Sequence, residues 1–301
     1  MTSSEQLLPN HSILPLGSPN KLAWMLGVPI KELQKIAVDS ERLYQPFSKK
    51  TGTKERIIHN PVSSLKKVQT KINERILHKF EFPEFIVGGI KGKQLEDHVS
   101  LHVRKPIVVT LDIKDFFPSI SYKKVYAAYT NRLEAGPDVA RLMTMLTTYK
   151  GSVPLGAPTS TLLASIVLLP CLQKVKVFVE NEAFDMTQFV DDTAISGQKL
   201  PEDLIKTICK IFSQDGFTIS RKKIAVMPSS RSQRVTKRIV NQKVGITRKE
   251  INRIRSAVNE LKSTPKDHGL YAKKCASLKG RIASIKPYNA TIAAKFLEEI
   301  L

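Results

Sequence analysis

The sequence predicts an α+β fold in which helices cover one face of an antiparallel sheet. Residues 107–113 (IVVTLDI) are mostly β-branched and apolar, as in a buried strand. Residues 187–196 (TQFVDDTAIS) predict two short strands that meet at an acidic turn. Residues 160–179 form a longer apolar stretch, which is typical of a buried helix. Because strands and helices are interleaved irregularly, an antiparallel sheet is favoured over a parallel one.

The N-terminal part is predicted to be helical and then to enter a strand. Residues 1–45 contain two short amphipathic segments, 18–28 and 29–38, and are expected to form an N-terminal helical extension. Residues 50–53 (KTGT) predict a turn. Residues 54–59 (KERIIH) predict a strand, which a proline stops shortly afterwards.

The middle of the chain is predicted to be mainly helical. Ser64 is a candidate N-cap for a helix whose apolar residues recur with helical spacing. The glycines within residues 88–92 predict a flexible stretch. Residues 122–149 are predicted to be helical with a break at a Gly-Pro pair, and Pro170 is a candidate kink in the helix over residues 160–179.

The last third of the chain predicts one more helix and strand, followed by a helical C-terminal region. Residues 201–215 predict a helix closed by glycine, and residues 217–226 predict a returning strand. From Arg248 onward the chain is predicted to be helical, with divisions around residues 265–269 and at Pro287.

The composition excludes several classes of protein. The 301 residues are 42% hydrophobic and 25% charged, which excludes disordered, collagen-like and disulfide-scaffold proteins. No uninterrupted apolar run reaches the roughly 18–20 residues that span a bilayer, and residues 1–12 lack the pattern of a secretory signal. Cys171, Cys209 and Cys275 are scattered, as expected in a reducing compartment. A cytoplasmic protein without a membrane partner is therefore expected.

The positive charge is concentrated in the C-terminal region. The whole chain has 48 Lys and Arg against 27 Asp and Glu, a net charge of +21. Residues 221–301 hold 20 Lys and Arg against 5 Asp and Glu, so they carry +15 of this total and the other 220 residues carry +6. A solvated helical face usually mixes both signs, whereas charge of one sign suits contact with phosphates. The C-terminal region is therefore predicted to bind nucleic acid.

Three carboxylates occupy positions where burial is costly. Asp112 follows the apolar strand, and Asp191 and Asp192 lie between two short strands. Taken singly, each has an ordinary explanation, because aspartate is common at turns and strand ends. Taken together, adjacent buried acids repel one another unless a cation neutralises them. Carboxylate oxygens that meet at the ends of strands suit Mg²⁺, and two such ions can support phosphoryl transfer.

The chain resembles the reverse transcriptases, and among them the bacterial retron-type group. The segments that carry the resemblance, in the order and spacing of that family, are 111–120 (LDIKDFFPSI), 153–160 (VPLGAPTS), 189–192 (FVDD) and 216–226 (GFTISRKKIAV). The resemblance implies a right-hand polymerase fold with fingers, a palm and a helical thumb. The parts that it implies are an N-terminal helical extension over 1–45, fingers and palm over 46–236, and a basic, RNA-binding thumb over 237–301.

The resemblance also implies roles for individual residues. Asp112, Asp191 and Asp192 would hold two Mg²⁺ ions, and Lys223 would join them in catalysis by acting on the pyrophosphate; its alternative is an ordinary solubilising lysine. Phe117 would be an aromatic gate that collides with a ribose 2′-OH; its alternative is an ordinary core aromatic. The residues implied to contact the nucleotide are Arg56, Asp115, Phe116, Phe117, Gly156 and Ala157. The residues implied to contact RNA are Lys237, Arg238, Arg253, Lys279 and Arg281.

The chain departs from the family pattern around the carboxylates. Leu155 stands where the family usually has Gln, and Phe189-Val190 stands where this group usually has Tyr-Ala. His102 matches the His of the retron NAxxH segment, but His98 stands in place of its Asn. Lys237 stands in place of the glycine of the retron VTG segment. All three carboxylates are kept, so catalysis is expected to survive these changes.

The favoured function is an RNA-directed DNA polymerase of the retron type. Such an enzyme copies part of its own structured noncoding RNA into single-stranded DNA, primed from a guanosine 2′-OH, for phage defence with an effector protein. The expected partners are therefore this RNA, its DNA product, dNTPs and an effector. A non-retron bacterial defence reverse transcriptase would share the same motifs. Other classes that remain are a catalytically silent RNA-binding protein on the same scaffold and a basic nuclease that uses the same acids.

Overall fold

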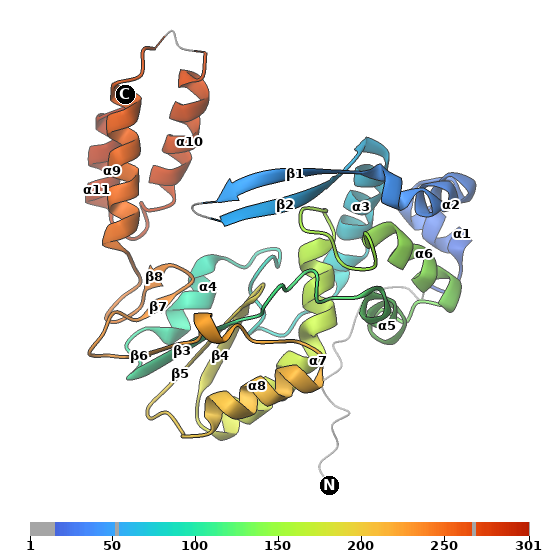
Figure 1. The fold of residues 1–301 in the computed structure, drawn as a ribbon, viewed down its shortest axis with the longest axis horizontal. Coiled ribbons are helices and arrows are strands. Elements are labelled where there is room, and N and C mark those ends of the chain that lie inside the picture. Colours follow the sequence, from blue (N-terminus) through green and yellow to red (C-terminus); the bar gives the residue numbers. More distant parts are fainter. Residues whose placement is uncertain (1–15, 52–53, 267–268, 301) are drawn as a thin grey trace.

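The fold is built around a four-stranded antiparallel sheet with the strand order β4-β5-β3-β6 (Figure 1). The computed structural model describes residues 16–51, 54–266 and 269–300. The strands of the sheet are β3 (Ile107–Asp112), β4 (Asp185–Phe189), β5 (Asp192–Gly197) and β6 (Ala225–Pro228). The predicted α+β class is therefore confirmed.

The two faces of this sheet pack against different elements, because successive strand residues point to opposite sides. Val109 and Leu111 belong to the main hydrophobic core, which they share with helices α7 (Ser160–Asn181) and α8 (Leu204–Gln214). Val108 belongs instead to a smaller cluster on the opposite face. The helices expected on one face are thus α7 and α8, while the other face has a different cover.

That other face is covered by elements that the sequence did not predict. They are the short helix α4 (Leu95–Val99) and a small antiparallel sheet of three strands, β7 (Arg234–Val235), β8 (Arg238–Ile239) and β9 (Gly245–Ile246). Val99 of α4 and Val235 of β7 are fully buried in the same cluster as Val108. Their apolar contacts hold α4 against the side of the sheet on which Asp112 lies.

The N-terminal helices belong to the main core. Helices α1 (Pro19–Leu26) and α2 (Ile30–Val38) are the two predicted amphipathic segments, and Leu22 and Leu33 are fully buried in the core that contains β3. The described part of the N-terminal extension therefore packs as part of the main body. Residues 1–12, which were expected to lack a secretory signal, lie outside the described residues.

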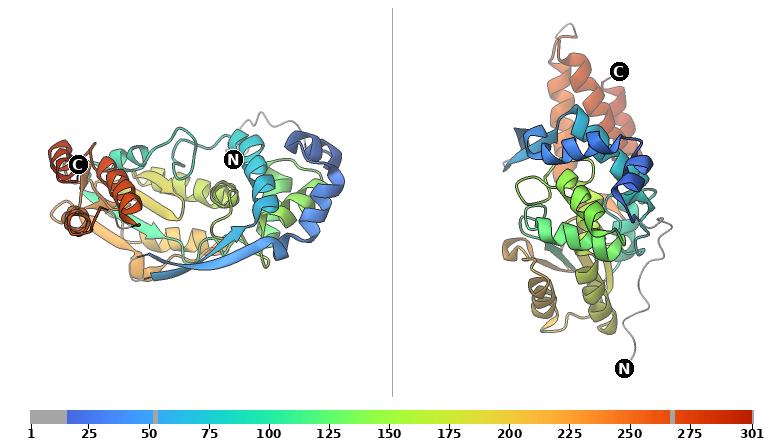
Figure 2. Two further views of the ribbon diagram at one scale, coloured as in Figure 1. Left: turned by 90° about the horizontal axis from the view of Figure 1, so that it is seen from above. Right: turned by 90° about the vertical axis from the view of Figure 1, so that its right-hand side faces the viewer.

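A two-stranded antiparallel ribbon follows these helices. Strand β1 (Tyr44–Thr51), which the sequence did not predict, pairs with β2 (Lys54–Pro61), and part of the turn predicted at 50–53 lies outside the described residues. The ribbon extends from the N-terminal helices toward the C-terminal helices (Figures 1 and 2). Helix α3 (Ser63–Arg75) then begins with Val62 at its N-cap and no side-chain cap, so the prediction for Ser64 was wrong.

The helices predicted in the middle of the chain are present. Helices α5 (Tyr122–Arg132) and α6 (Pro137–Thr147) are separated at the Gly-Pro pair, and α7 continues through Pro170. Among the described residues, only α7 is long and apolar enough to cross a membrane, and 61% of its apolar window is buried inside the protein. Because α7 shares the core with the sheet, its composition is that of a core helix.

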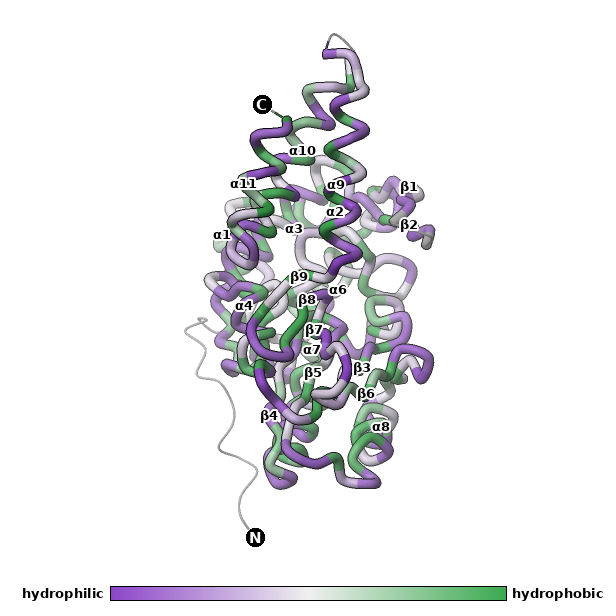
Figure 3. Tube along the Cα trace, turned by 90° about the vertical axis from the view of Figure 1, so that its left-hand side faces the viewer, coloured by the Kyte–Doolittle hydropathy of each residue, from purple (hydrophilic) through white to green (hydrophobic). Residues whose placement is uncertain are grey.

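The last three helices form a separate bundle with its own core. They are α9 (Arg248–Lys262), α10 (Tyr271–Ala283) and α11 (Ala290–Glu298), as predicted, and they lie at the opposite end of the molecule from α1 and α2 (Figure 2). Hydrophobic and hydrophilic positions alternate along each of them (Figure 3). Their core begins at Ile246 and includes Ile254 and Phe296. The expected boundary after residue 236 instead divides the β7-β8-β9 sheet, and the packing places the boundary next to Ile246.

Candidate active site

Three carboxylates meet at one end of the central sheet. In the antiparallel pairing of β3 with β5, Asp112 lies directly opposite Asp192. Asp191 precedes β5, and its carbonyl oxygen accepts a backbone hydrogen bond from Ile113 at 3.1 Å. Strand pairing therefore brings together residues that are about 80 positions apart in the sequence, as the acidic pattern predicted.

The electrostatics of this cluster are those of a cation site. Burial, together with the nearby Asp191 and Asp112, raises the pKa of Asp192 to about 6. Burial likewise raises the pKa of Asp191, with Asp112 adding to the effect and Lys223 and Arg56 opposing it. Uncompensated negative charge of this kind is relieved when a metal ion binds.

The donor set fits Mg²⁺ in an open site. Among the described residues, no three or more His, Cys, Asp or Glu side chains are arranged so that they could hold a metal ion by themselves. Mg²⁺ usually takes one or two carboxylates and completes its shell with water and substrate phosphates, so a closed protein cage is not needed. Asp112, Asp191 and Asp192 are the residues of this chain that fit that requirement.

Lys223 lies beside these acids but not on a strand. Its Nζ donates a hydrogen bond to Asp112 Oδ1, and it belongs to the 3₁₀ turn η4 (Arg221–Lys223). The strand predicted over residues 217–226 was therefore wrong in part, since only β6 from Ala225 onward is regular strand. The Lys223 side chain is 43% exposed, whereas the Asp112 side chain is 14% exposed. The half-exposed lysine can therefore reach another anion, provided that another cation then neutralises the mostly buried Asp112.

The turn between β4 and β5 is strained. Phe189 pairs with Asp192, so Val190 and Asp191 form a two-residue hairpin loop. Val190 has a φ of 57°, a left-handed conformation that β-branched residues rarely adopt. Its carbonyl oxygen accepts a hydrogen bond from Gln188 Nε2 at 2.9 Å. The surrounding contacts must therefore hold the carboxylate-bearing turn in place.

Gly88 supplies one of these contacts. Its backbone N–H donates to the carbonyl of Gln188 at 3.3 Å. A Cβ atom at position 88 would lie 2.3 Å from the backbone nitrogen of Val190, closer than any side chain can approach. The prediction that residues 88–92 form a loose, flexible stretch was therefore wrong at its first position, because Gly88 packs directly against the acidic hairpin.

Two buried histidines support the same hairpin from α4 and the following turn. His98 Nδ1 and His102 Nε2 lie 2.8 and 2.7 Å from Thr187 Oγ1 on β4. His102 Nδ1 lies 2.7 Å from Ser196 Oγ on β5, and the ring of His98 lies 5.4 Å from that of Phe189. His102 thus has a structural role. Most single histidines in proteins are likewise hydrogen-bonded structural residues and not ligands.

Both histidines are neutral in the folded protein. Burial lowers the pKa of His98 to about 3, with the neighbouring His102 adding to the effect. Burial also lowers the pKa of His102 to about 4. Each ring therefore has one N–H donor and one acceptor nitrogen. Hydroxyl groups, which can donate or accept, match this pattern.

We expect these histidines to make the protein sensitive to acid. Because their pKa values in the folded state lie below the ordinary 6.5, the unfolded state binds more protons below that pH. The stability that they contribute is complete above about pH 6.5 and is lost as the pH falls toward about 4. Urea unfolding of the wild type and of a His98→Asn/His102→Gln double variant between pH 7.5 and 4.5 measures this. The difference between the two free energies of unfolding should shrink with falling pH, and parallel curves would contradict the prediction.

The β1–β2 ribbon brings a cation toward the carboxylates. Arg56 is exposed on β2 opposite Lys49, and it is one of two cations that oppose the rise in the pKa of Asp191 caused by burial. At its base the ribbon contacts the Gly-rich loop, since the N–H of His59 donates to the carbonyl of Leu155 at 2.8 Å. The ribbon and the loop, which both carry predicted nucleotide contacts, therefore lie against each other.

Gly156 and Ala157 lie in that loop. Gly156 has a φ of 113°, which favours glycine, and a Cβ there would lie 2.6 Å from Ile58 Cγ2 of the ribbon. Ala157 is buried, and α7 starts at Ser160. The glycine lets the loop pass close under the ribbon.

The three predicted residues after Asp112 differ in exposure. Asp115 is exposed and has a φ of 47°, whereas Phe116 is only 4% exposed and lies in the main core. Any contact of Phe116 with a nucleotide would therefore involve its backbone. Phe117 is half-buried, with its ring 5.3 Å from that of Phe116. A half-buried ring is held in place by the core and still presents an edge to solvent.

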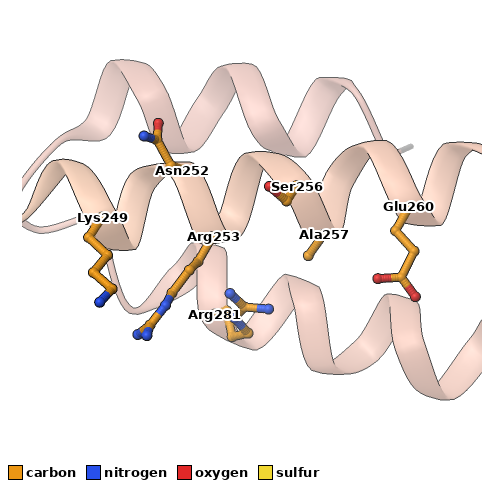
Figure 4. A pocket seen from close by; sticks show the side chains of 7 residues that line it. All are labelled: Lys249, Asn252, Arg253, Ser256, Ala257, Glu260 and Arg281. Carbon is orange, nitrogen blue, oxygen red and sulfur yellow. The ribbon is translucent and has the colours of Figure 1, made fainter. Parts of the chain in front are cut away.

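A shallow groove of about 730 Å³ between α9 and α10 gathers cations from both helices (Figure 4). The side chains of Lys249 and Arg253 lie toward one end, Arg281 lies near the middle, and the carboxylate of Glu260 lies toward the other end. Lys249 was missed in the sequence, although its spacing of four residues from Arg253 on a helix places both on one face. Two of the predicted RNA contacts are thus brought together.

The other predicted RNA contacts have different surroundings. Lys279 is exposed on α10 but does not line the groove. Lys237 is exposed in the β7–β8 turn with a φ of 69°, the conformation that suits the glycine of the family pattern. The guanidinium of Arg238 instead lies 4.6 Å from the ring centroid of Tyr288, which lies between α10 and α11.

An acidic metal-type site at the end of an antiparallel sheet, approached by a basic ribbon and a basic helical bundle, defines a polymerase-like class of protein. Residues 48–272 match the family model described as "Reverse transcriptase (RNA-dependent DNA polymerase)". The chain belongs to the reverse transcriptase family.

Within that family the chain is similar to retron enzymes. It is 32% identical to the retron Se72 reverse transcriptase of Salmonella heidelberg (strain 579083-10) over 193 residues, covering 64% of this chain and 51% of the relative. It is 26% identical to the retron Ec86 enzyme of Escherichia coli, covering 73% and 69%. It is also 26% identical to the retron Mx65 enzyme of Myxococcus xanthus, covering 79% and 62%. The match thus spans about half the length of the Se72 relative, and the resemblance to retron-type reverse transcriptases is confirmed.

Proposed function

We propose that this chain is an RNA-directed DNA polymerase of the retron type. The observation that carries the proposal is the cluster of Asp112, Asp191 and Asp192 at the end of the central sheet, in a chain of the reverse transcriptase family. A protein that only binds RNA has no use for buried carboxylates whose pKa values are raised by burial and mutual repulsion.

The three carboxylates would hold two Mg²⁺ ions. When bound, these ions supply activation of the attacking hydroxyl and stabilisation of the leaving pyrophosphate. The protein's own contribution is to fix the carboxylates through the β3–β5 pairing and the supported hairpin. Lys223, paired with Asp112 in the free protein, would turn to the phosphates of the incoming dNTP, where it can donate a proton to the pyrophosphate.

The arrangement supports a division into fingers, palm and thumb. The β1–β2 ribbon would be the fingers, with Arg56 placed to bind the triphosphate, and the central sheet with α7 and α8 would be the palm. Gly156 and Ala157, in the loop held against the ribbon, would contact the incoming nucleotide before α7 begins. The C-terminal bundle would be the thumb, which would grip an RNA–DNA duplex through its phosphates.

The RNA partner proposed is a structured noncoding RNA that is both template and primer. The enzyme would copy part of this RNA into single-stranded DNA, primed from a guanosine 2′-OH, in the cytoplasm and in phage defence with an effector protein. The similarity to retron reverse transcriptases supports the retron type. The decisive experiment incubates the protein with its co-expressed RNA, Mg²⁺ and labelled dNTPs. We expect labelled DNA joined to RNA. RNA binding without DNA would support a silent RNA-binding protein, and shortened RNA would support a nuclease.

Replacement of Phe117 by alanine should relax the choice between deoxyribose and ribose. The half-buried ring presents an edge where a 2′-OH would collide, and alanine removes that edge. The ratio of ribonucleotide to deoxyribonucleotide incorporation should rise about tenfold or more in single-nucleotide extension. Phe82, another partly buried aromatic against the main core, provides the matched control in a Phe82→Ala variant. An unchanged ratio in Phe117→Ala would show that the ring is an ordinary core aromatic.

Loss of the groove arginines should weaken the binding of RNAs of any sequence to the same extent. Arg253 and Arg281 line the groove together, and a cation that contacts a phosphate contributes about one unit to the salt dependence of binding. Filter binding of the co-expressed RNA over a range of salt concentrations should show a slope reduced by about 1 for Arg253→Ala and again for Arg281→Ala. Lys206→Ala, on the exposed surface of α8, is the control and should leave the slope unchanged.

A further inference from the structure

Helix α4 lies between the acidic hairpin and the C-terminal bundle and contacts both. We propose that α4 is a positioning element that sets the bundle relative to the carboxylates, with Glu96 holding Tyr288 on one side and His98 holding the β4–β5 hairpin on the other. This inference rests on the proposed polymerase function, since it concerns the placement of the duplex grip over the site of synthesis.

The contact with the bundle is a polar latch made by Glu96, Tyr288 and Arg238. Tyr288 Oη donates a hydrogen bond of 2.6 Å to Glu96 Oε1. The guanidinium of Arg238 lies 4.6 Å from the centroid of the same ring, and the Arg238 Nε is buried without a hydrogen-bond partner. A hydrogen bond to a carboxylate and a cation over an aromatic face are directional contacts, so they define an orientation as well as an attachment.

The other side of α4 is fixed to the central sheet. Val99 is fully buried beside Val108 of β3, and His98 bonds Thr187 and packs on Phe189, two residues before Asp191. The start of α4 is closed by a capping box, in which the backbone N–H of Gln94 donates to Asp97 Oδ2 at 2.6 Å. A helix of one turn would fray alone, and these contacts make it rigid.

The bundle needs such a contact because its packing is separate from the rest of the molecule. Its core runs from Ile246 to Ile300 and includes no residue of the central sheet. The chain enters the bundle through the short segment between β9 and α9. A body attached through β9 alone can pivot unless a second point is held, and the Tyr288 latch is such a point.

The test separates nucleotide addition from the length of DNA made per binding event. Tyr288→Phe and Glu96→Ala each remove the hydrogen bond, while Glu96→Gln keeps an acceptor oxygen. We expect the first two to shorten products about fivefold or more in the presence of a competitor trap, with single-nucleotide addition within about twofold of the wild type. Glu96→Gln should restore product length. The Tyr288→Phe/Glu96→Ala double variant should make products as short as those of the two single variants. Glu299→Ala, which breaks the Lys262–Glu299 pair inside the bundle, is the control.

The two proposals can fail separately. Unchanged product length in Tyr288→Phe, or an equal fall in single-nucleotide addition and product length, would overturn the positioning role. A wild-type protein that makes no DNA would contradict the polymerase proposal instead. In that case small-angle X-ray scattering of the same variants still tests whether the latch fixes the position of the bundle. Tyr288→Phe should widen the distribution of molecular dimensions, and a curve identical to that of the wild type would overturn the latch.

Discussion

Asp191→Asn should abolish DNA synthesis while the protein remains folded. The substitution keeps the shape of the side chain but removes one of three charges at the end of β3 and β5, where Asp112 faces Asp192. Loss of a group that acts only in the transition state lowers kcat and kcat/KM together, here by on the order of 10³-fold or more. The measurement is single-nucleotide extension on a preformed RNA–DNA duplex with saturating Mg²⁺ and dNTP.

The stability of the same variant provides the internal check. Burial raises the pKa of the Asp191 carboxyl, and Asp112 adds to this, so a neutral side chain removes an unfavourable charge. Without divalent cations, the Tm should stay the same or rise, and RNA binding should be unchanged. Asp203→Asn, at an exposed carboxylate beside α8, serves as the control with full activity. An Asp191→Asn variant that still makes DNA would refute the assignment of the active site.

Gly88→Ala should also reduce activity strongly, although no functional group is lost. The added methyl would lie 2.3 Å from the Val190 backbone nitrogen and 2.8 Å from the Phe189 carbonyl carbon, so the hairpin must move. Overpacking of this kind costs about 1–3 kcal/mol of stability. A shift of the carboxylates by about 1 Å costs on the order of 10²-fold in rate. Extension assays and urea unfolding of the purified variant measure the two effects.

Gly17→Ala is the matched control, because nothing lies within 4 Å of a Cβ at position 17. It should leave both activity and the free energy of unfolding close to those of the wild type. If Gly88→Ala were as active as Gly17→Ala, the hairpin would tolerate displacement, and the support given by residue 88 would have no bearing on catalysis.

Much of the fold could be predicted from local sequence patterns. The strand over residues 107–112, the helix over 160–181 and the three C-terminal helices each have a periodicity that their own residues determine. Strand β1 and the β7-β8-β9 sheet were missed because their strands are irregular in pattern or only two residues long. The strand expected through Lys223 was wrong, since the chain there turns so that the ammonium group reaches Asp112.

The site was predictable where acids stand out from an apolar background and less so where neutral groups act at long range. The three carboxylates could be found because buried charge is rare. The packing of Gly88 under Val190 and the contact of His98 with Thr187 join segments about 90–100 residues apart, and nothing local signals either. Tyr288 likewise lies in the turn between α10 and α11, whose sequence gives no hint of Glu96 as its partner.

The two separate hydrophobic cores have a consequence for how the molecule is made. The larger core joins Leu16 to Ile219, so it cannot be completed until more than two thirds of the chain has been synthesised. The second core uses only residues between Ile246 and Ile300, whose contacts are close in sequence and therefore form fast. Synthesis from the N-terminus thus completes the acidic centre first and the basic bundle last. If the bundle is the thumb proposed above, a nascent chain would gain its strongest hold on RNA only once the proposed catalytic centre is complete.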